Sequence, residues 1–294
     1  MTSDYGENVP YEVVPESNDR EYKRSIWGAA IGLQAVDGLK PSEYLLSLAD
    51  DNINGRKTYS EISEELIKEY KDRDDRQKEA DIVSCRIAQI LEQSTFVMSP
   101  EFLLSIHDFL FEDVFSPDWV GRFRKVNLTK EEDILYGDTV YYTDFLSIKS
   151  QLRFLLEEET SYKYSHPMSL DDINHLSEFT RNVWQTHPFR EGNTRTTAVF
   201  IEMYLLSMGY DVNNQPFKEN GLYYRNALVR SCYKCDEKGI IPTYEYLNIF
   251  YRNILNNESI TMSINDQFIL TPDEPDPTVD TDDIDPEHEE DVDI

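Results

Sequence analysis

One stretch of nine residues, 187–195, brings together side chains suited to acid–base, metal and anion chemistry. His187 can take a proton from a hydroxyl group, Glu191 can hold a divalent cation through its oxygens, and Arg195 can contact phosphate. The turn between them consists of Gly192, Asn193 and Thr194. A turn that starts a helix offers free N–H groups to anions. Together these features predict the transfer of a phosphate-containing group.

Two helices are expected on either side of this loop. Residues 172–184 carry apolar side chains at helical spacing, and Pro188 follows directly after this segment. Residues 197–208 are apolar nearly throughout, which is typical of a buried helix. Taken singly, each polar residue of the loop can be interpreted as a capping or turn residue. Their combined spacing favours a site in a loop between two core helices.

The loop resembles the signature of Fic-domain proteins, His-x-Phe-x-(Asp/Glu)-Gly-Asn-Gly-Arg-x-x-Arg. The matching positions are His187, Phe189, Glu191, Gly192, Asn193 and Arg195. Thr194 stands where glycine is usual, and Ala198 stands where the second arginine is usual. Residues 104–111 with 119–124 resemble a family helix and the stretch leading to the family's flap, and residues 223–228 resemble a third segment. The resemblance spans roughly residues 84–255.

Most studied members of this family transfer AMP from ATP to a hydroxyl side chain of a target protein. The resemblance therefore implies a protein adenylyltransferase that uses ATP as substrate and Mg²⁺ as cofactor. His187 would be the catalytic base, and Glu191 would hold the Mg²⁺. The implied nucleotide- and phosphate-binding residues are Gly192, Asn193, Thr194, Arg195, Tyr224 and Asn226. In the family the second arginine orients the γ-phosphate, so Ala198 leaves the true donor open.

Two other functions remain open. One is a different transfer on the same scaffold, either phosphorylation or phosphocholine transfer. Phosphorylating relatives have a lysine and an alanine in this loop, where this chain has Gly192 and Thr194. The other is a catalytically silent regulatory or binding protein, although such a protein has no use for a base at His187.

The segment 1–79 predicts a polar arm followed by a small helical module. This module resembles the antitoxin modules that block the ATP site in the family through the motif (Ser/Thr)-x-x-x-Glu-(Gly/Asn). The glutamate position falls on Asp37, and Asp51 also fits the spacing. In the family this glutamate pairs with the second arginine, here Ala198. We therefore expect Asp37, an altered regulatory residue, to form no such ion pair, and the module to pack through Trp27, Ile31 and its leucines.

The composition of the chain indicates its capacity for a core, its partners and its compartment. A chain of 294 residues with 39% hydrophobic content can form a substantial core. Its net charge of −29 argues against nucleic acid as a partner. No apolar run is long enough for a membrane span, and three cysteines indicate a reducing compartment. We expect a cytoplasmic protein without membrane contact whose partner is a protein target with a hydroxyl side chain; a homo-oligomer remains among the open alternatives.

The expected fold is mainly α: a Fic-type helical bundle with a small β-hairpin flap and an N-terminal helical module. Residues 80–268 would form the Fic core domain, with six to eight helices around an apolar central pair. Residues 269–294 would form a disordered acidic tail, because 271–294 contain twelve Asp or Glu and no Lys or Arg. The hairpin is predicted at residues 126–142, and the resemblance implies that it holds a target segment by strand pairing. His107 is predicted to be a hydrogen-bonded core histidine.

Overall fold

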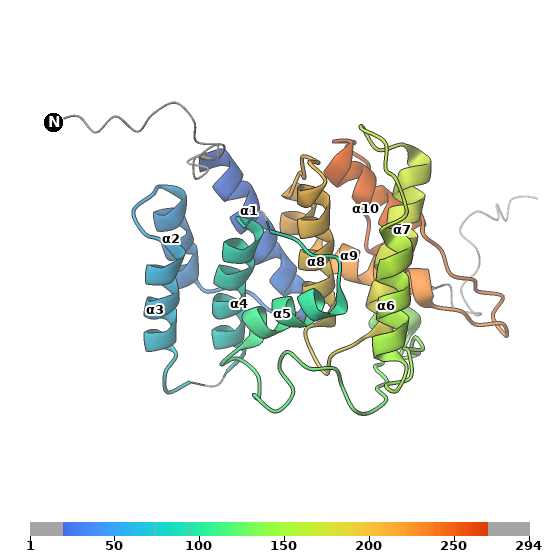
Figure 1. Cartoon of the computed structure of the whole chain (residues 1–294), viewed down its shortest axis with the longest axis horizontal. Helices are drawn as coiled ribbons and strands as arrows, with labels where there is room; N and C mark the ends of the chain where they lie inside the picture. The colour runs from blue at the N-terminus through green and yellow to red at the C-terminus, as the bar shows by residue number, and fades with distance from the viewer. Residues whose placement is uncertain (1–19, 74, 94, 270–294) are drawn as a thin grey trace, which may run out of the picture.

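The computed structural model describes residues 20–73, 75–93 and 95–269, and it is mainly α-helical, as predicted (Figure 1). The predicted polar arm before residue 20 and the acidic tail after residue 269 lie outside the described residues. The ten α-helices of the described part are α1 Arg20–Gly32, α2 Glu43–Ile53, α3 Tyr59–Glu69, α4 Arg76–Leu91, α5 Pro100–Phe111, α6 Ile148–Glu159, α7 Leu170–Thr186, α8 Asn193–Ser207, α9 Gln215–Cys232 and α10 Glu245–Leu255. Three 3₁₀ helices accompany them, η1 Leu33–Asp37, η2 Asp133–Leu135 and η3 Asn265–Gln267.

Helix α8 is the buried centre of the molecule. Every residue from Asn193 to Leu205 is buried, as its apolar sequence predicted. Helices α4, α5 and α7 pack against α8, and Figure 1 shows α8 and α9 between α4 on one side and α6 and α7 on the other. Because α7 and α8 are both held by the core, the loop that joins them has fixed ends.

Sequence signals explain where α7 begins and ends. Ser169 caps its first turn, and Asp172 completes a capping box with it, which satisfies two N–H groups that would otherwise lack partners. The helix ends at His187, whose backbone has the left-handed conformation (φ +44°). This conformation is uncommon outside glycine. It turns the chain sharply just where the loop begins.

The N-terminal helices are packed into the same hydrophobic core as the rest. Helix α1 contacts α4 and α9, and its buried side chains belong to one continuous cluster with those of α4–α10. Trp27 belongs to this cluster, and its indole donates to Asn52 and stacks near Tyr59 within the N-terminal module. The contact with α9 includes a close approach of the two backbones.

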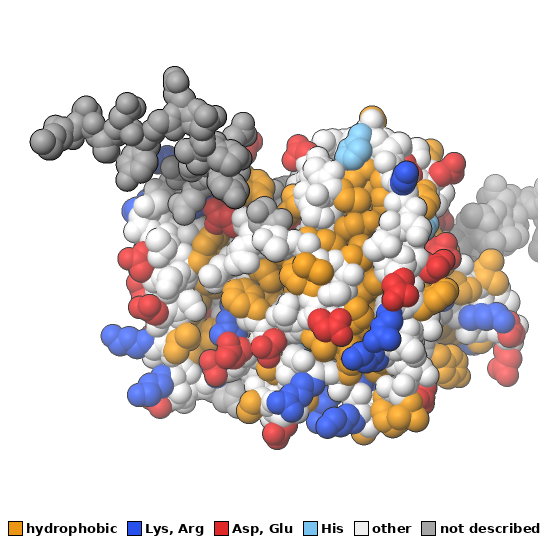
Figure 2. All heavy atoms as spheres, viewed as in Figure 1, with side chains coloured by type: hydrophobic (Ala, Val, Ile, Leu, Met, Phe, Trp, Pro, Cys, Tyr) orange, Lys and Arg blue, Asp and Glu red, His pale blue; other side chains and the backbone are white. Residues whose placement is uncertain are grey.

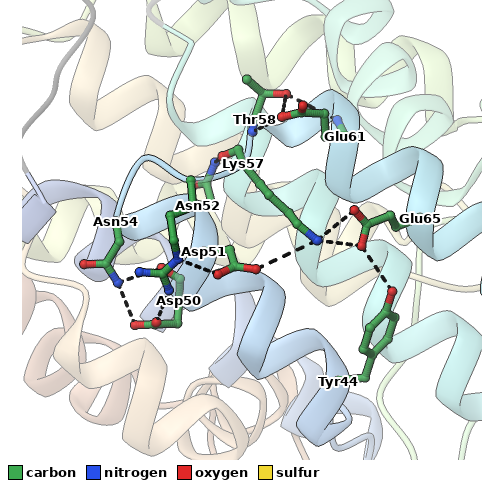
Figure 3. Close-up of polar contacts among 10 residues, drawn as sticks. Tyr44, Asp50, Asp51, Asn52, Asn54, Lys57, Thr58, Glu61 and Glu65 are labelled. Atoms are coloured by element: carbon green, nitrogen blue, oxygen red, sulfur yellow. Dashed lines mark hydrogen bonds and ion pairs between the residues drawn. The ribbon is translucent and has the colours of Figure 1, made fainter.

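Asp51, one of the two candidates for the inhibitory position, is used in the turn between α2 and α3. Its carboxylate accepts a hydrogen bond of 2.6 Å from Arg56 and lies 3.8 Å from the ammonium of Lys57. Figure 3 shows Lys57 between Asp51 and Glu65, which holds the turn against α3. Asp51 therefore stabilises the connection to α3 from the last turn of α2, and Asp37 is the remaining candidate.

The predicted β-hairpin at residues 126–142 is not formed as strands, and this part of the prediction is wrong. The chain folds back on itself, with a hydrogen bond of 2.9 Å from Glu132 N–H to the carbonyl of Asp138, but its tip is the 3₁₀ helix η2. Both Ile134 and Leu135 are buried, whereas a strand would point neighbouring side chains to opposite faces. We call residues 125–143 the flap segment.

The surface carries both signs of charge. Figure 2 shows acidic and basic side chains interspersed on the visible face, with hydrophobic side chains exposed between them. The excess of acidic residues is thus not gathered into one patch on this face. Among the helices of the described residues, none combines the length and the apolar character needed to cross a bilayer.

The contact between α1 and α9 gives a test of the packing. A Cβ atom at Gly32 would lie 2.1 Å from the carbonyl oxygen of Phe217, whereas one at Gly28 would meet only the Lys218 side chain at 3.3 Å. Overpacking against backbone is destabilising. We expect Gly32→Ala to lower the free energy of unfolding in urea by about 2 kcal/mol or more. The matched variant Gly28→Ala should stay within about 1 kcal/mol of wild type, and equal effects would contradict this packing.

A second test concerns the carboxylate of Glu202, which is buried in α8. Its oxygens have no hydrogen-bond partner among the described residues, and burial raises its pKa from 4.5 to about 7, although the nearby Asn214 side chain opposes this. Because the folded-state pKa lies above the unfolded one, stability is lost as pH rises from 4.5 through about 7. Glu202→Gln should therefore raise the free energy of unfolding at pH 8 by about 1 kcal/mol or more.

This gain should shrink as the pH of the urea titration falls through 4.5, because well below that pH Glu202 is protonated in both states. The matched variant is Glu178→Gln, on the exposed face of α7, which should show no such pH-dependent gain. A Glu202→Gln gain of the same size at both pH values would show that the buried charge is not its origin.

Candidate active site

His187 closes α7 and lies on the wall of a cavity. Its backbone N–H donates to Trp184 at 3.0 Å, and its ring stacks on Tyr142 with centroids 3.8 Å apart. Nδ1 is buried without a hydrogen-bond partner among the described residues. Burial first, and then the nearby charges of Arg124, Lys130 and Arg225, lower the pKa of His187 from 6.5 to about 3. The ring is therefore neutral near pH 7 and can accept a proton.

Arg124 ties the loop 187–195 to the flap segment. Its Nε donates to the carbonyl of His187 at 2.7 Å, and its other nitrogens donate to the carbonyls of Val126 and Thr143. Its own N–H donates to the carbonyl of Pro188. Sequence reasoning gave Arg124 no role, although it ends the stretch 119–124 that carried the family resemblance.

The loop 187–195 packs against α5 on the side away from the cavities. The ring of Phe189 stacks on His107 at 3.8 Å, and His107 receives the N–H of Gly121 on Nδ1, so that Nε2 donates to the carbonyl of Glu191. His107 is thus a hydrogen-bonded core histidine, as predicted. A Cβ at Gly192, whose φ is +75°, would lie 2.5 Å from the Phe111 ring. Only glycine fits this turn.

Asn193 and Thr194 use their side chains to hold the turn. The Asn193 amide exchanges two hydrogen bonds of 2.9 Å with the backbone of Phe189, and the Thr194 hydroxyl accepts from the Trp184 indole at 3.0 Å. Their backbone N–H groups, at the start of α8, have no partner among the described residues. Any contribution of these two residues to anion binding therefore comes from the backbone.

Two adjoining cavities meet at the loop. The first, of about 320 Å³, is lined by His187, Glu191, Gly192, Asn193 and Thr194. The second, of about 690 Å³, is lined in part by Asn226, Leu222 and Phe268. Four residues belong to the walls of both: Asp37, Lys130, Glu191 and Arg225. Cavities of this size accommodate nucleotide-sized ligands.

The two residues predicted to face the nucleotide, Tyr224 and Asn226, lie in different environments in the structure. Asn226 lines the larger cavity. Tyr224 lies in the hydrophobic core, with its ring packed against Phe217 and Phe250, and it lines neither cavity. Tyr224 and Asn226 are two positions apart on α9, so their side chains point in different directions. The structure thus places Asn226, and not Tyr224, on the wall of a cavity.

Glu191 has an environment suited to a cation. Its carboxylate lies on the wall of both cavities. Burial first, then the charges of Asp37 and Glu79, raise its pKa, while Lys130 and Arg195 oppose this. A divalent ion would relieve the repulsion among these carboxylates. Within the described residues no group of three or more His, Cys, Asp or Glu could hold a metal ion.

Arg195 does not point into either cavity. Its side chain is 1% exposed. Nη2 donates to Glu79 at 2.6 Å and Nη1 donates to the Gln34 amide oxygen at 3.0 Å, whereas Nε lies 2.8 Å from Asp37 in an ion pair without hydrogen-bond geometry. Its guanidinium also lies over the Phe111 ring. These partners come from η1 and α4. We call these four residues the Arg195 cluster.

The Arg195 cluster gives Asp37 a partner that the sequence did not indicate. We expected Asp37 to form no ion pair with position 198, because that position holds Ala198. Ala198 is indeed buried and uncharged, but Asp37 pairs with Arg195, one turn earlier on α8. Sequence reasoning missed Glu79 and Gln34, which are 116 and 161 positions from Arg195 and carry no local signal of this contact.

Comparison with known proteins agrees with the loop and its surroundings. Residues 97–205 match the Fic/DOC family. Over these residues the chain is therefore similar to Fic/DOC domains. Two curated relatives, each named "Probable protein adenylyltransferase Fic", come from Salmonella typhimurium and Escherichia coli. They are 27% and 28% identical to this chain over 129 and 130 residues, which is 44% of this chain.

The Fic/DOC relationship covers only part of each protein, since the match spans 60% of the length of both curated relatives. Among solved structures, the N-terminal Fic domain of a Bartonella effector protein from Bartonella sp. AR 15-3 is similar. It has 15% identity and a TM-score of 0.41, over 68% of this chain and 80% of that one. The helix pair and loop described above lie within or next to the matched Fic/DOC residues.

The Arg195 cluster predicts an effect on stability. Removing one partner of a buried ion pair leaves charges uncompensated and costs about 3–5 kcal/mol. Arg195→Ala should therefore lower the free energy of unfolding in urea by about 3 kcal/mol. The matched variant is Arg190→Ala, an exposed arginine of the same loop, which should change it by less than about 1 kcal/mol. Similar losses in both variants would contradict a structural role for Arg195.

Proposed function

We propose that this protein is an Mg²⁺-dependent protein adenylyltransferase that transfers AMP from ATP to a Ser, Thr or Tyr hydroxyl of a target protein. One observation carries the proposal: a base, a carboxylate and the free N–H groups of a helix start line the same cavity of about 320 Å³. The names of the two curated relatives support AMP as the transferred group.

In the proposed reaction, the hydroxyl oxygen of the target attacks the α-phosphorus of ATP. The new oxygen–phosphorus bond forms as the bond to the bridging oxygen breaks, and pyrophosphate leaves. His187 takes the hydroxyl proton. Its stacking on Tyr142 fixes the plane of the ring. Incoming phosphate charge would offset the cations that lower its pKa and so make His187 a stronger base.

The remaining residues would position the nucleotide. Mg²⁺, when bound, neutralises phosphate charge, and Glu191 would hold it, since Mg²⁺ is usually bound by one or two carboxylates together with substrate phosphates. The N–H groups of Asn193 and Thr194 would contact phosphate oxygens after the turn at Gly192. Asn226, on the wall of the larger cavity, would face the adenine or the ribose.

We also propose a division of the chain into an N-terminal module, residues 1–79, and a Fic core, residues 80–268. The module would resemble family antitoxin modules, with Asp37 as its altered regulatory residue. Support comes from the three helices α1–α3, which precede the helices around the loop. The shared hydrophobic core implies that the two parts act as one body.

The reaction can be tested with ATP labelled either at the α- or at the γ-phosphate. The protein is incubated with Mg²⁺ and a mixture of candidate targets, and self-modification is read as a surrogate by intact mass. We expect incorporation of the α-label with the mass of AMP. His187→Ala should lower the rate by about 10²–10⁴. The matched variant His166→Ala, an exposed histidine outside both cavities, should retain it.

The same assay separates the rival functions. Incorporation of the γ-label alone indicates phosphorylation and would replace the proposal. A mass increase without either label, in the presence of a choline-containing nucleotide, indicates phosphocholine transfer. If no group is transferred by the wild-type chain, the silent binding function is favoured. Equal rates for wild type and His187→Ala would remove His187 as the base.

A further inference from the structure

The walls of the two cavities carry four cations, and they differ in whether a protein partner already neutralises them. These cations are Arg76, Lys130, Arg190 and Arg225. Arg225 forms a two-point ion pair with Glu132, at 2.6 and 3.0 Å. Arg76 donates to the carbonyl of Asp37 and lies 4.0 Å from Glu79. A charge that is already paired has less to offer an incoming anion.

Lys130 and Arg190 have no ion pair in the part of the chain that the structure describes. Arg190 lines only the smaller cavity, and its guanidinium lies over the Trp119 ring. Lys130 is exposed and lines both cavities. Its charge acts on both His187 and Glu191. A free cation therefore lies at the point where a nucleotide would pass from one cavity to the other.

The backbone around Lys130 is fixed, although its side chain is exposed. The N–H of Lys130 donates to the Thr139 hydroxyl at 3.4 Å. Two residues further on, Glu132 is anchored to Arg225 on α9 and is 2% exposed. The flap segment thus holds Lys130 over the site through a buried ion pair. A mobile surface lysine would lack such an anchor.

Arg195 differs from Lys130 in each of these respects. It lines neither cavity, it is 1% exposed, and its guanidinium nitrogens are all engaged in the Arg195 cluster. Freeing it for a ligand would leave Asp37 and Glu79 without their cation. Ala198 offers no charge either. The helix α8 therefore supplies backbone N–H groups to the site but no side-chain cation.

We propose that Lys130 is the side chain that binds the phosphate groups of the nucleotide, and that Arg195 is a structural residue that ties the loop to α4 and η1. This inference rests on the proposed function for the identity of the ligand. It assigns the cationic contact to the flap segment, which the sequence motif does not include. The ligand class is a nucleotide with at least two phosphate groups.

The test is a calorimetric titration of the whole chain with Mg²⁺ and ATP, and separately with adenosine. We expect Lys130→Ala to weaken binding of ATP at least tenfold and to leave binding of adenosine unchanged, because adenosine has no phosphate. Lys130→Arg should bind ATP within threefold of wild type. The matched variant Lys125→Ala removes an exposed lysine of the same segment that lines neither cavity, and it should match wild type.

Each result decides the inference. Lys130→Ala that binds ATP within twofold of wild type overturns it, and so does an equal loss for ATP and adenosine, since that loss would come from the shape of the cavity. A wild-type chain that binds neither ligand overturns both the inference and the proposed function. If ATP binding depends on Lys130 but the labelled-ATP assay shows no transfer, the proposed function fails and the inference stands.

Discussion

The buried guanidinium of Arg195 is the interaction on which the geometry of the site depends. It gathers one carboxylate from η1 and one from α4 at the start of α8. Two carboxylates this close repel each other unless a cation lies between them. With Arg195 in place, the N-terminal segment, α4 and the loop are held in register. The direction of the first turn of α8, and with it the direction of its free N–H groups, follows from this contact.

The same cluster sets the electrostatics of the cavities. Asp37 and Glu79 lie close enough to Glu191 to raise its pKa, so three carboxylates share one side of the site. Arg195 compensates part of this charge from behind the wall. An anionic nucleotide would thus meet a wall with excess negative charge, unless a divalent ion and Lys130 accompany it. If the proposed function holds, a metal-bound nucleotide would therefore be a better ligand for the site than a free one.

Sequence reasoning located the site but not the pairing of its charges. The loop 187–195 and the buried helix after it were predictable, because turn residues and apolar periodicity are local signals. The features that sequence reasoning missed depend on distant contacts. The flap segment forms no strands, since Glu132 and Leu135 turn inward. Tyr224 faces the core, because the rotation of α9 about its own axis sets which of Tyr224 and Asn226 points to the cavity. Arg195 finds partners that only the fold brings near.

The substitution at position 198 is best understood together with Asp37. Ala198 is 1% exposed and packed in the core, one turn of α8 beyond Arg195. An arginine there would offer a second cation to the carboxylates of η1 and α4, and Arg195 would then be free to contact a ligand. With alanine, Arg195 alone must balance Asp37 and Glu79. With alanine at position 198, the proposed role of Arg195 is structural, although Arg195 matches the family signature and the sequence around it gives no sign of this role.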